Sequence, residues 1–424
     1  SEGKNRYMVS CNRKKSIAIV GTGISGSISA LKSLQKNLDV TIFEKSKNFG
    51  GILCDAVDKN EIYFNACQYL NPEEEWFKLL DRKNFELNRF YHDKATYSDL
   101  FDEEVYENDI AGPLIKKKLD IGLLISLKKS KKNLSQRLST YPEIIKNNLL
   151  EWLDFIKVDP AQISWNAATG LAINRFFFRS NIKELKEEKE KNPLFDNLVG
   201  LSRNEMGLKE IDASLPAKGF NHFFENLKKK LLTNNVNVNL NTIVKPTWEK
   251  NNLFLTVNNK KLSFDKIIWT GNPTGLIKNY GLPLLDSTHI NSKHFYFEFE
   301  GQIKNNLYIQ VYSKKTAINR IFMYNLNGKN KITVETLSTE LNINDLIKFC
   351  NQVFEKSKLS IKINESGNIY SDLHKKYILF STKDEEIIKD FIKSLKKSNL
   401  IHGNWLEYGR DQKINHLIKE IENI

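Results

Sequence analysis

The stretch from Ser16 to Gly51 constrains the fold more than any other part of this sequence. Ser16–Val20 is a short apolar run, which is typical of a buried strand. Where this strand would turn into a helix, three glycines follow with the spacing G-x-G-x-x-G: Gly21, Gly23 and Gly26. The first permits a tight turn, the second lets the backbone approach a pyrophosphate, and the third lets the helix pack close to the strand. The pattern therefore predicts a dinucleotide-binding βαβ unit.

The next strand supports the same interpretation. Val40–Phe43 is apolar, and Glu44 ends it about 20 residues after the glycines, as the fingerprint requires. A carboxylate at this position can accept hydrogen bonds from the ribose hydroxyls of an adenosine. The helix between the two strands would direct its N-terminal N–H groups toward the phosphates. The alternative is a glycine-rich surface turn, and the complete strand–helix–strand–acid context argues against it.

The residues after this acid indicate which dinucleotide binds. Glu44 and Lys45 are followed by Gly50 and Gly51 in the pattern E-K-x-x-x-x-G-G. This pattern resembles the FAD-binding oxidoreductases, a family that includes amine oxidases, protoporphyrinogen oxidase and UDP-galactopyranose mutase. In that family the glycine pair lets the chain pass close to the cofactor. The resemblance implies that the cofactor is FAD rather than NAD.

Later segments resemble UDP-galactopyranose mutase in the same order along the chain. The carriers are Lys218-Gly219-Phe220, the run FDKIIWTG over 264–271, Asn319-Arg320-Ile321, and GNWLEY over 403–408. The resemblance implies further FAD contacts from Thr270, Gly271, Gly403 and Asn404. It also implies an α/β fold, with a Rossmann-type FAD-binding domain, a helical insertion and an antiparallel β-sheet substrate-binding domain.

The domain boundaries that we expect follow from these segments. They are 1–102 for the N-terminal part of the FAD-binding core, 103–210 for a mainly helical insertion, 211–290 for a return to the FAD-binding domain, 291–400 for the β-sheet substrate domain, and 401–424 for the C-terminal FAD-binding segment and helix. Apolar spacing predicts helices over 141–155, 220–232 and 344–356. A further helix is expected to begin with Asn71 as its N-cap and Pro72 at its first position.

The resemblance also implies the residues that meet the substrate. Arg320 matches a mutase arginine that binds the substrate diphosphate, and Tyr377 lies where a substrate tyrosine belongs. Arg410 aligns near a tyrosine that holds the diphosphate. A planar guanidinium suits paired anionic oxygens, so we expect a catalytic site that contains Arg320, Tyr377 and Arg410. An ordinary salt bridge on a strand face is the alternative for Arg320.

Several positions depart from the mutase pattern. The mutases place a histidine beside the isoalloxazine, whereas the corresponding stretch here, residues 65–69, has Cys67 and no histidine. The mutases also carry an arginine where this chain has Asn404. Three residues lie where mutases contact the uracil and the diphosphate: Trp165, Arg175 and Arg179. The run NRFFFR over 174–179, which contains the two arginines, also has the spacing of a helix core.

Three functions stay open at this point. The first is a flavin-dependent enzyme that acts on a nucleotide sugar, a mutase-like isomerase that interconverts pyranose and furanose forms in surface polysaccharide biosynthesis. The second is an oxidoreductase of the amine oxidase type, which moves a hydride from another small-molecule substrate to FAD. The third is a flavin-fold protein that has lost catalysis and binds a partner or ligand.

The composition of the chain narrows the classes of protein to which it can belong. With 40% hydrophobic residues in 424, the chain is expected to be globular. Its apolar runs fall short of the roughly 18 residues of a membrane span, so we expect no integral membrane segment, and residues 1–15 lack the apolar core of a signal peptide. The four cysteines have no metal-binding spacing, which argues against a metal site and for a cytoplasmic location. The net charge is +13, but the excess lysines are spread along the chain with glutamates near them, so no nucleic-acid partner is expected. The sequence leaves open whether the protein forms a homo-oligomer.

Overall fold

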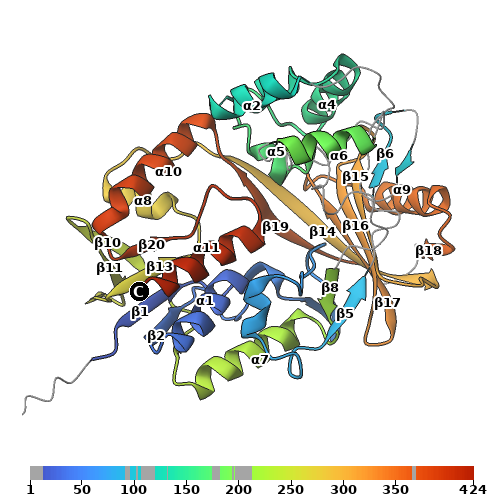
Figure 1. The fold of residues 1–424 in the computed structure, drawn as a ribbon. Helices are drawn as coiled ribbons and strands as arrows, with labels where there is room; N and C mark the ends of the chain where they lie inside the picture. The colour runs from blue at the N-terminus through green and yellow to red at the C-terminus, as the bar shows by residue number, and fades with distance from the viewer. Residues whose placement is uncertain are drawn as a thin grey trace, which may run out of the picture.

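Figure 1 shows three parts of the protein: a sheet at the lower left, which we name the nucleotide-binding sheet after the prediction above, a large second sheet at the right, and a group of helices at the top. The computed structural model describes residues 13–90, 96–101, 104–106, 120–130, 132–173, 182–192, 195, 213–364 and 369–424. The long strands β14 (Thr288–Gly301) and β19 (Tyr370–Leu379) run between these parts.

The first sheet is parallel and has the strand order β20-β13-β1-β2-β9. Its strands come from distant parts of the chain: β1 (Ser16–Val20), β2 (Asp39–Phe43), β9 (Asn237–Asn239), β13 (Lys266–Trp269) and β20 (Leu400–His402). Side chains alternate across β1, so that Ile17 and Ile19 join one core cluster and Ala18 joins another. The sheet is therefore buried on both faces, as parallel sheets are.

Helices and a small antiparallel sheet cover these two faces. The Ile17 and Ile19 face packs against α1 (Ile24–Gln35), α7 (Phe220–Thr233) and α11 (Arg410–Glu422). The opposite face packs against β10 (Lys245–Glu249), β11 (Asn252–Val257), β12 (Lys260–Leu262), α8 (Thr274–Tyr280) and α10 (Thr382–Ser394). Because α11 lies against α1, the C-terminal segment is part of the nucleotide-binding unit.

The second sheet is mostly antiparallel and has the order β18-β14-β17-β16-β15-β6-β7, with β19 also paired to β14. The remaining strands of this sheet are β6 (Thr96–Ser98), β7 (Val105–Tyr106), β15 (Leu307–Tyr312), β16 (Ile318–Leu326), β17 (Lys329–Thr336) and β18 (Ile361–Ile363). One face, with Ile309 and Met323, packs against α9 (Ile343–Lys356). The other face, with Tyr308 and Tyr324, shares the core of the nucleotide-binding unit.

The third part is helical and forms its own core around Trp152 and Leu149. Its helices are α2 (Ile121–Lys129), α3 (Leu134–Leu138), α4 (Glu143–Phe155), α5 (Ala167–Gly170) and α6 (Ile182–Lys191). Several hydrogen bonds join it to the other parts; among them, Tyr312 Oη donates to the Ala172 carbonyl at 2.7 Å, and Ser164 N donates to the Phe380 carbonyl at 2.8 Å. This group therefore lies across the ends of β15 and β19.

The predicted α/β class, with a Rossmann-type unit and a second β-sheet unit, is confirmed. The helix predicted from Asn71 is wrong. Asn71 Oδ1 accepts a hydrogen bond from Glu73 N at 3.3 Å and forms a turn, and a short 3-10 helix, η2, follows at Glu75–Leu79. Tertiary packing overrides the helix signal here, because Trp76 is fully buried and its Nε1 donates to Asp411 Oδ1 at 2.8 Å.

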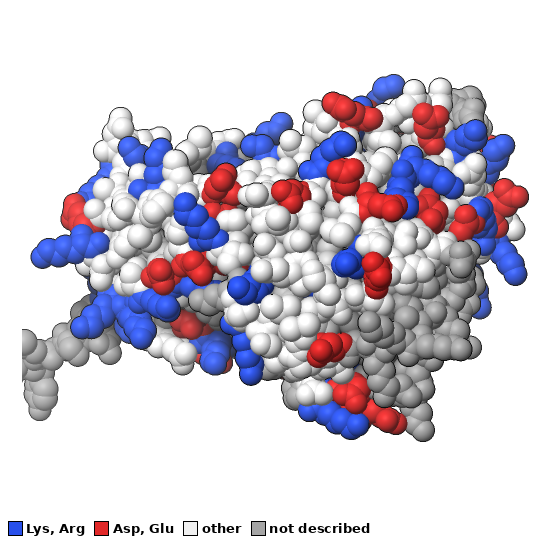
Figure 2. Space-filling model, turned by 90° about the horizontal axis from the view of Figure 1, so that it is seen from above, with Lys and Arg blue, Asp and Glu red and all other residues white. Residues whose placement is uncertain are grey.

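Two surface properties bear on the partners of the protein. Within the described ranges, none of the helices is both long and apolar enough to pass through a lipid bilayer. On the face seen in Figure 2, lysines and arginines are interspersed with aspartates and glutamates over much of the surface.

Candidate functional site

The glycine loop after β1 requires glycine at two of its positions for steric reasons. Gly21 has φ +107°, and a Cβ there would lie 2.3 Å from Thr270 Oγ1. A Cβ on Gly26 would lie 2.0 Å from the Gly21 carbonyl oxygen. The loop therefore packs tightly against β13 on one side and against α1 on the other.

Gly23 differs from these two glycines because the space beside it is open. A Cβ on Gly23 would meet no described atom within 4 Å, apart from its chain neighbours. Gly23 is the N-cap of α1, and the N–H groups of the first turn have no partner within the helix. The glycine pair closes one side of this space, since a Cβ on Gly51 would lie 3.1 Å from Gly23 Cα, and Gly50 N donates to Thr22 Oγ1 at 3.2 Å. The geometry is a cradle for an anionic group at a helix N-terminus.

Glu44 directly follows β2 beside this loop and is almost fully buried. Its Oε2 accepts from Thr22 N and Thr22 Oγ1, both at 2.9 Å, and its Oε1 accepts from Ser46 N at 2.8 Å. A carboxylate has about four acceptor positions, so roughly one is left for a ribose hydroxyl. Glu44 therefore holds the glycine loop in place and keeps some capacity for a ligand.

The remaining predicted cofactor residues lie at the ends of three strands. Thr270 directly follows β13, and its Oγ1 donates to the Val20 carbonyl at 2.8 Å; Lys45 and Gly271 are exposed. Gly403 follows β20, and a Cβ there would lie 2.7 Å from the Trp269 carbonyl oxygen. Asn404 has φ +53°, and its N–H donates to His402 Nδ1 at 3.2 Å. All of these ends lie at the carboxyl edge of one parallel sheet, where such sheets bind ligands.

Residues 64–69, which we call the tethered segment, connect this cradle to the second sheet. Asn65 Nδ2 donates to the carbonyl of Ile52, next to the glycine pair, at 3.2 Å. Phe64 N donates to Tyr324 Oη at 2.9 Å, and Cys67 N donates to Glu335 Oε1 at 2.6 Å. Residues 65–69 correspond to the mutase segment that places a histidine beside the isoalloxazine. Side chains of the second sheet thus hold this segment in place.

Arg320 lies on β16 in contact with a buried carboxylate. Its Nε donates to Gln310 Oε1 at 3.2 Å, and its Nη1 lies 3.6 Å from Oε2 of Glu335, which is fully buried. The guanidinium carbon lies 5.9 Å from the Tyr308 ring centroid. The predicted diphosphate ligand therefore takes part in an ion pair that also reaches the tethered segment through Glu335.

Polar side chains continue from Arg320 across the same sheet. Tyr308 Oη donates to Gln310 Oε1 at 2.8 Å, and Gln310 Nε2 donates to Asn319 Oδ1 at 2.9 Å. Asn319 Nδ2 in turn donates to Tyr377 Oη at 3.3 Å. Gln310 is fully buried and Asn319 nearly so. A buried polar network of this kind specifies one arrangement of side chains, and the structure places Arg320 and Tyr377 at two of its ends.

Arg410 begins α11 and points toward the tethered segment. Its Nη1 donates to Gln68 Oε1 at 3.2 Å, and its Nη2 donates to the Tyr69 carbonyl. Burial lowers the pKa of Arg410, and the neighbouring Asp411 carboxylate opposes that shift. The two arginines predicted as substrate ligands are thus both connected to residues 67–69, Arg320 through Glu335 and Arg410 directly.

Trp165 belongs to the core of the helical part. It is 3% exposed, and the Arg137 guanidinium carbon lies 4.9 Å from its ring centroid. Arg137 Nη1 also donates to the Trp165 carbonyl at 3.2 Å. The ring face that a uracil would need is therefore partly occupied by Arg137. The other two predicted contacts, Arg175 and Arg179, lie outside the described residues.

Asp55 is a buried acid near the site that the sequence reasoning did not single out. Its carboxylate accepts from Phe220 N at 3.0 Å and from Asn221 N at 2.8 Å, and so caps α7. Burial raises the pKa of Asp55 to about 7, against the lowering effect of these two N–H groups. Gly219 is required here, because a Cβ would lie 2.6 Å from Asp55 Oδ2.

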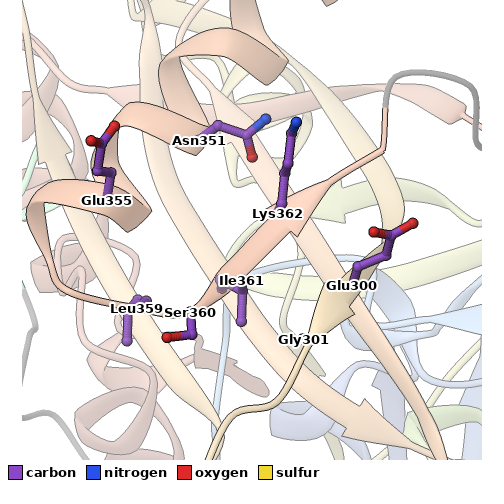
Figure 3. A pocket seen from close by; sticks show the side chains of 8 residues that line it. All are labelled: Glu300, Gly301, Asn351, Glu355, Leu359, Ser360, Ile361 and Lys362. Atoms are coloured by element: carbon purple, nitrogen blue, oxygen red, sulfur yellow. The ribbon is translucent and has the colours of Figure 1, made fainter.

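A cavity of about 520 Å³ lies at the far end of the second sheet, between the end of α9 and the edge strand β18. Figure 3 shows its lining residues, among them Asn351, Glu355 and Lys362. Asn351 Oδ1 accepts from Ile363 N at 2.9 Å, and Asn351 Nδ2 donates to the Ile363 carbonyl at 3.4 Å. This cavity contains none of the predicted site residues, and we assign it no part in the site.

The most informative contacts missed by sequence reasoning are long-range ones. Glu335, Gln310 and His294 carried no motif, and each reaches the site only through strand pairing in the second sheet. The alternation of β17 could have placed Glu335 on a sheet face, but it could not have named Arg320 and Cys67 as its partners. Among the described residues, no group of three or more His, Cys, Asp or Glu side chains is arranged to hold a metal ion.

Comparisons with known proteins agree with this architecture. Residues 19–82 match the family model of an NAD(P)-binding Rossmann-like domain. The whole fold is similar to a reduced UDP-galactopyranose mutase, with TM-score 0.67 and 13% identity over 97% of this chain and 95% of that chain. It is also similar to a putative protoporphyrinogen oxidase from Exiguobacterium sp. 255-15, with TM-score 0.63 and 11% identity over 97% and 98% of the two chains.

A wild-type putrescine oxidase bound to putrescine is a third similar structure, with TM-score 0.56 and 11% identity over 97% of this chain and 99% of that chain. No curated protein matches the sequence. At such low identities these similarities concern the fold, and the fold expected from the resemblance is confirmed.

Proposed function

We propose that the protein is a flavoenzyme that binds FAD without a covalent bond, in the cradle formed by the glycine loop and the glycine pair. The observation that carries this proposal is the open space at Gly23, next to an uncapped helix start and closed on one side by Gly51. Gly21, Gly26 and Thr270 shape the loop, and Glu44 has an acceptor position left for the ribose.

The far end of the cofactor would lie near residues 65–69 and the start of α11. These two elements meet at the Arg410 contacts with Gln68 and Tyr69. Gly403, Asn404 and Gly271 lie at neighbouring strand ends, and we propose that they flank the cofactor there. When bound, FAD would supply the redox or nucleophilic chemistry that the side chains lack.

For the substrate, we propose a nucleotide sugar and a mutase-like isomerisation between ring forms. Arg410 contacts the tethered segment directly and Arg320 reaches it through Glu335, and a guanidinium is the best donor to a diphosphate. Tyr377, at the end of the Gln310 and Asn319 network, would help to orient the sugar. These side chains would bind and orient the substrate and exclude water from it.

The test begins with the visible absorbance spectrum of protein refolded with FAD, followed by titration with UDP. Arg320→Ala is expected to weaken UDP binding by ~30-fold or more while FAD stays bound, because removing one partner of a desolvated ion pair costs about 2–5 kcal/mol. Arg320→Lys keeps the charge next to Glu335 and lacks the planar fork, so it separates a lost contact from a misfolded site. Lys362→Ala, in the remote cavity, is the matched control.

Turnover then separates the reactions. Dithionite-reduced protein is expected to convert a UDP-sugar, and oxidised protein is not. Absence of flavin absorbance after refolding with FAD would contradict the proposed cofactor. A flavin-bound protein that ignores UDP and UDP-sugars would contradict the proposed substrate and leave the cofactor proposal intact.

One observation favours a second candidate, an oxidoreductase of the amine oxidase type. The buried Glu335 carboxylate lies 3.6 Å from Arg320 and offsets its charge, which weakens the site for a diphosphate and suits a less anionic substrate. Steady oxygen consumption with a small amine, together with no response to UDP, would support this candidate over the mutase-like one.

A further inference from the structure

Two stacked histidines lie directly behind the tethered segment. His294 on β14 and His374 on β19 have ring centroids 4.1 Å apart, with 30° between the ring planes. His294 is 1% exposed, and its Nδ1 lies 2.6 Å from the Asn65 carbonyl oxygen. A carbonyl can only accept, so His294 Nδ1 carries a proton and donates it in this hydrogen bond.

Asn65 is held from three sides in this arrangement. Its carbonyl accepts from His294, and its Oδ1 accepts from Tyr296 Oη at 2.6 Å. Its Nδ2 donates to the Ile52 carbonyl, which directly follows the glycine pair. A continuous path of hydrogen bonds therefore leads from the histidine pair to the backbone that closes the cradle at Gly23.

The groups that surround the pair come from every element packed on it. On β19, Asp372 Oδ2 lies 3.9 Å from His374 Nε2, and the Tyr370 ring stacks on Tyr296 at 5.3 Å. Tyr296 Oη lies 3.5 Å from His374 Nε2, and the Tyr63 ring of β4 (Glu61–Tyr63) lies 5.6 Å from the Tyr296 ring. On β17, Glu335 is the register partner of His294, and Cys67 lies on the segment itself.

We propose that His294 and His374 are positioning residues of the candidate site. They fix the position of Asn65 through the hydrogen bond that His294 donates to its carbonyl, in a segment that itself contains no histidine. This inference rests on the proposed function, because it assumes that residues 65–69 lie beside the flavin. It concerns residues that carried no motif in the sequence.

The chemistry of the pair makes this role pH-dependent. Two imidazolium charges 4.1 Å apart repel each other strongly in a buried setting, so the pair takes up one proton over the ordinary pH range. The nearby Asp372 carboxylate directs that proton to His374, whose pKa burial lowers. Acidification is therefore expected to place one positive charge on the His374 ring, which is stacked on His294.

The experiment is a pH titration of the FAD-bound protein from pH 5 to 8, followed by flavin absorbance. Because the pKa of Asp55 is about 7, the reference protein and every variant in this titration carry Asp55→Asn. The reference protein is expected to show one transition, with a midpoint below the ordinary histidine pKa of about 6.5. His374→Phe keeps a stacked ring and should abolish the transition. His289→Gln, an exposed histidine on the same strand β14, is the matched control and should leave it unchanged.

A second measurement does not depend on the cofactor. Hydrogen exchange of the peptide spanning residues 65–69 is expected to be at least ~10-fold faster in His294→Phe than in the wild type, and unchanged in His289→Gln. A flavin spectrum that is constant from pH 5 to 8, a transition that survives in His374→Phe, or unchanged exchange in His294→Phe would overturn the inference. If no flavin binds, the proposed function fails, and the exchange rates still decide whether the pair positions the segment.

Discussion

Replacing Gly23 with alanine should separate folding from cofactor binding. The backbone at Gly23 has φ −57° and ψ 173°, which alanine adopts without strain, and the space beside it is open. Alanine has fewer conformations than glycine in the unfolded chain. Gly23→Ala is therefore expected to leave the apo protein as stable as the wild type, or more stable by about 0.4–1 kcal/mol.

The same methyl group would occupy the position where a pyrophosphate must approach the backbone. Loss of one hydrogen bond to a charged group costs about 1.5–3 kcal/mol, which corresponds to ~10- to 150-fold weaker FAD binding. In Gly23→Ala, the affinity for FAD should thus fall, while the free energy of unfolding of the apo protein should stay the same or rise. The assays are urea unfolding of the apo protein and fluorescence titration with FAD.

Gly26→Ala is the informative comparison for this variant. Its Cβ would lie 2.0 Å from the Gly21 carbonyl oxygen, so the overpacking should destabilise the fold by about 1–3 kcal/mol. If Gly23→Ala binds FAD within twofold of the wild type, the cradle does not hold the pyrophosphate. If Gly23→Ala unfolds as readily as Gly26→Ala, the open space beside it has been misjudged.

Two further predictions concern pH. The pKa of Asp55 is raised to about 7 in the folded protein, so folding favours the protonated carboxyl. Its contribution to stability is therefore complete at low pH and is lost as pH rises toward 7. Asp55→Asn should flatten the fall in unfolding free energy between pH 4 and 8, by up to roughly 4 kcal/mol in urea titrations. Burial and the neighbouring His416 lower the pKa of His402 to about 4, so its contribution is present above about pH 6.5 and is lost as pH falls toward 4. His402→Gln should therefore reduce acid sensitivity in the same assay, and an unchanged profile would contradict the assignment.

The nucleotide-binding half of the fold could be predicted because its signals are local. The strand at Ser16–Val20, the glycine spacing and the strand at Asp39–Phe43 all lie within a short stretch, and the structure has them where the sequence places them. The helix Phe220–Thr233 and the strand pairing of β11 with β12 also follow local patterns. Periodicity and turn residues are enough for elements of this kind.

The second sheet was less accessible from the sequence. The sequence does not predict the strands β17, β18 and β19. In β19, charged and polar residues obscure the alternation of apolar and polar positions that would indicate a strand. The contacts of the candidate site fall across these strands: Arg320 meets Glu335, and His294 meets His374. Such pairings depend on register between distant strands, which no local pattern encodes.

The strand order of the nucleotide-binding sheet has a consequence for biosynthesis. Its central strand β1 is made early, but its neighbour β13 and the edge strand β20 follow some 250 and 380 residues later, and α11 completes the packing on α1. A nascent chain on the ribosome therefore carries an unfinished parallel sheet until β20 has been made. Contacts of such long sequence separation close slowly, and exposed strand edges invite misassembly in the meantime. We expect a chain truncated before Leu400 to emerge as an aggregation-prone intermediate that depends on chaperones.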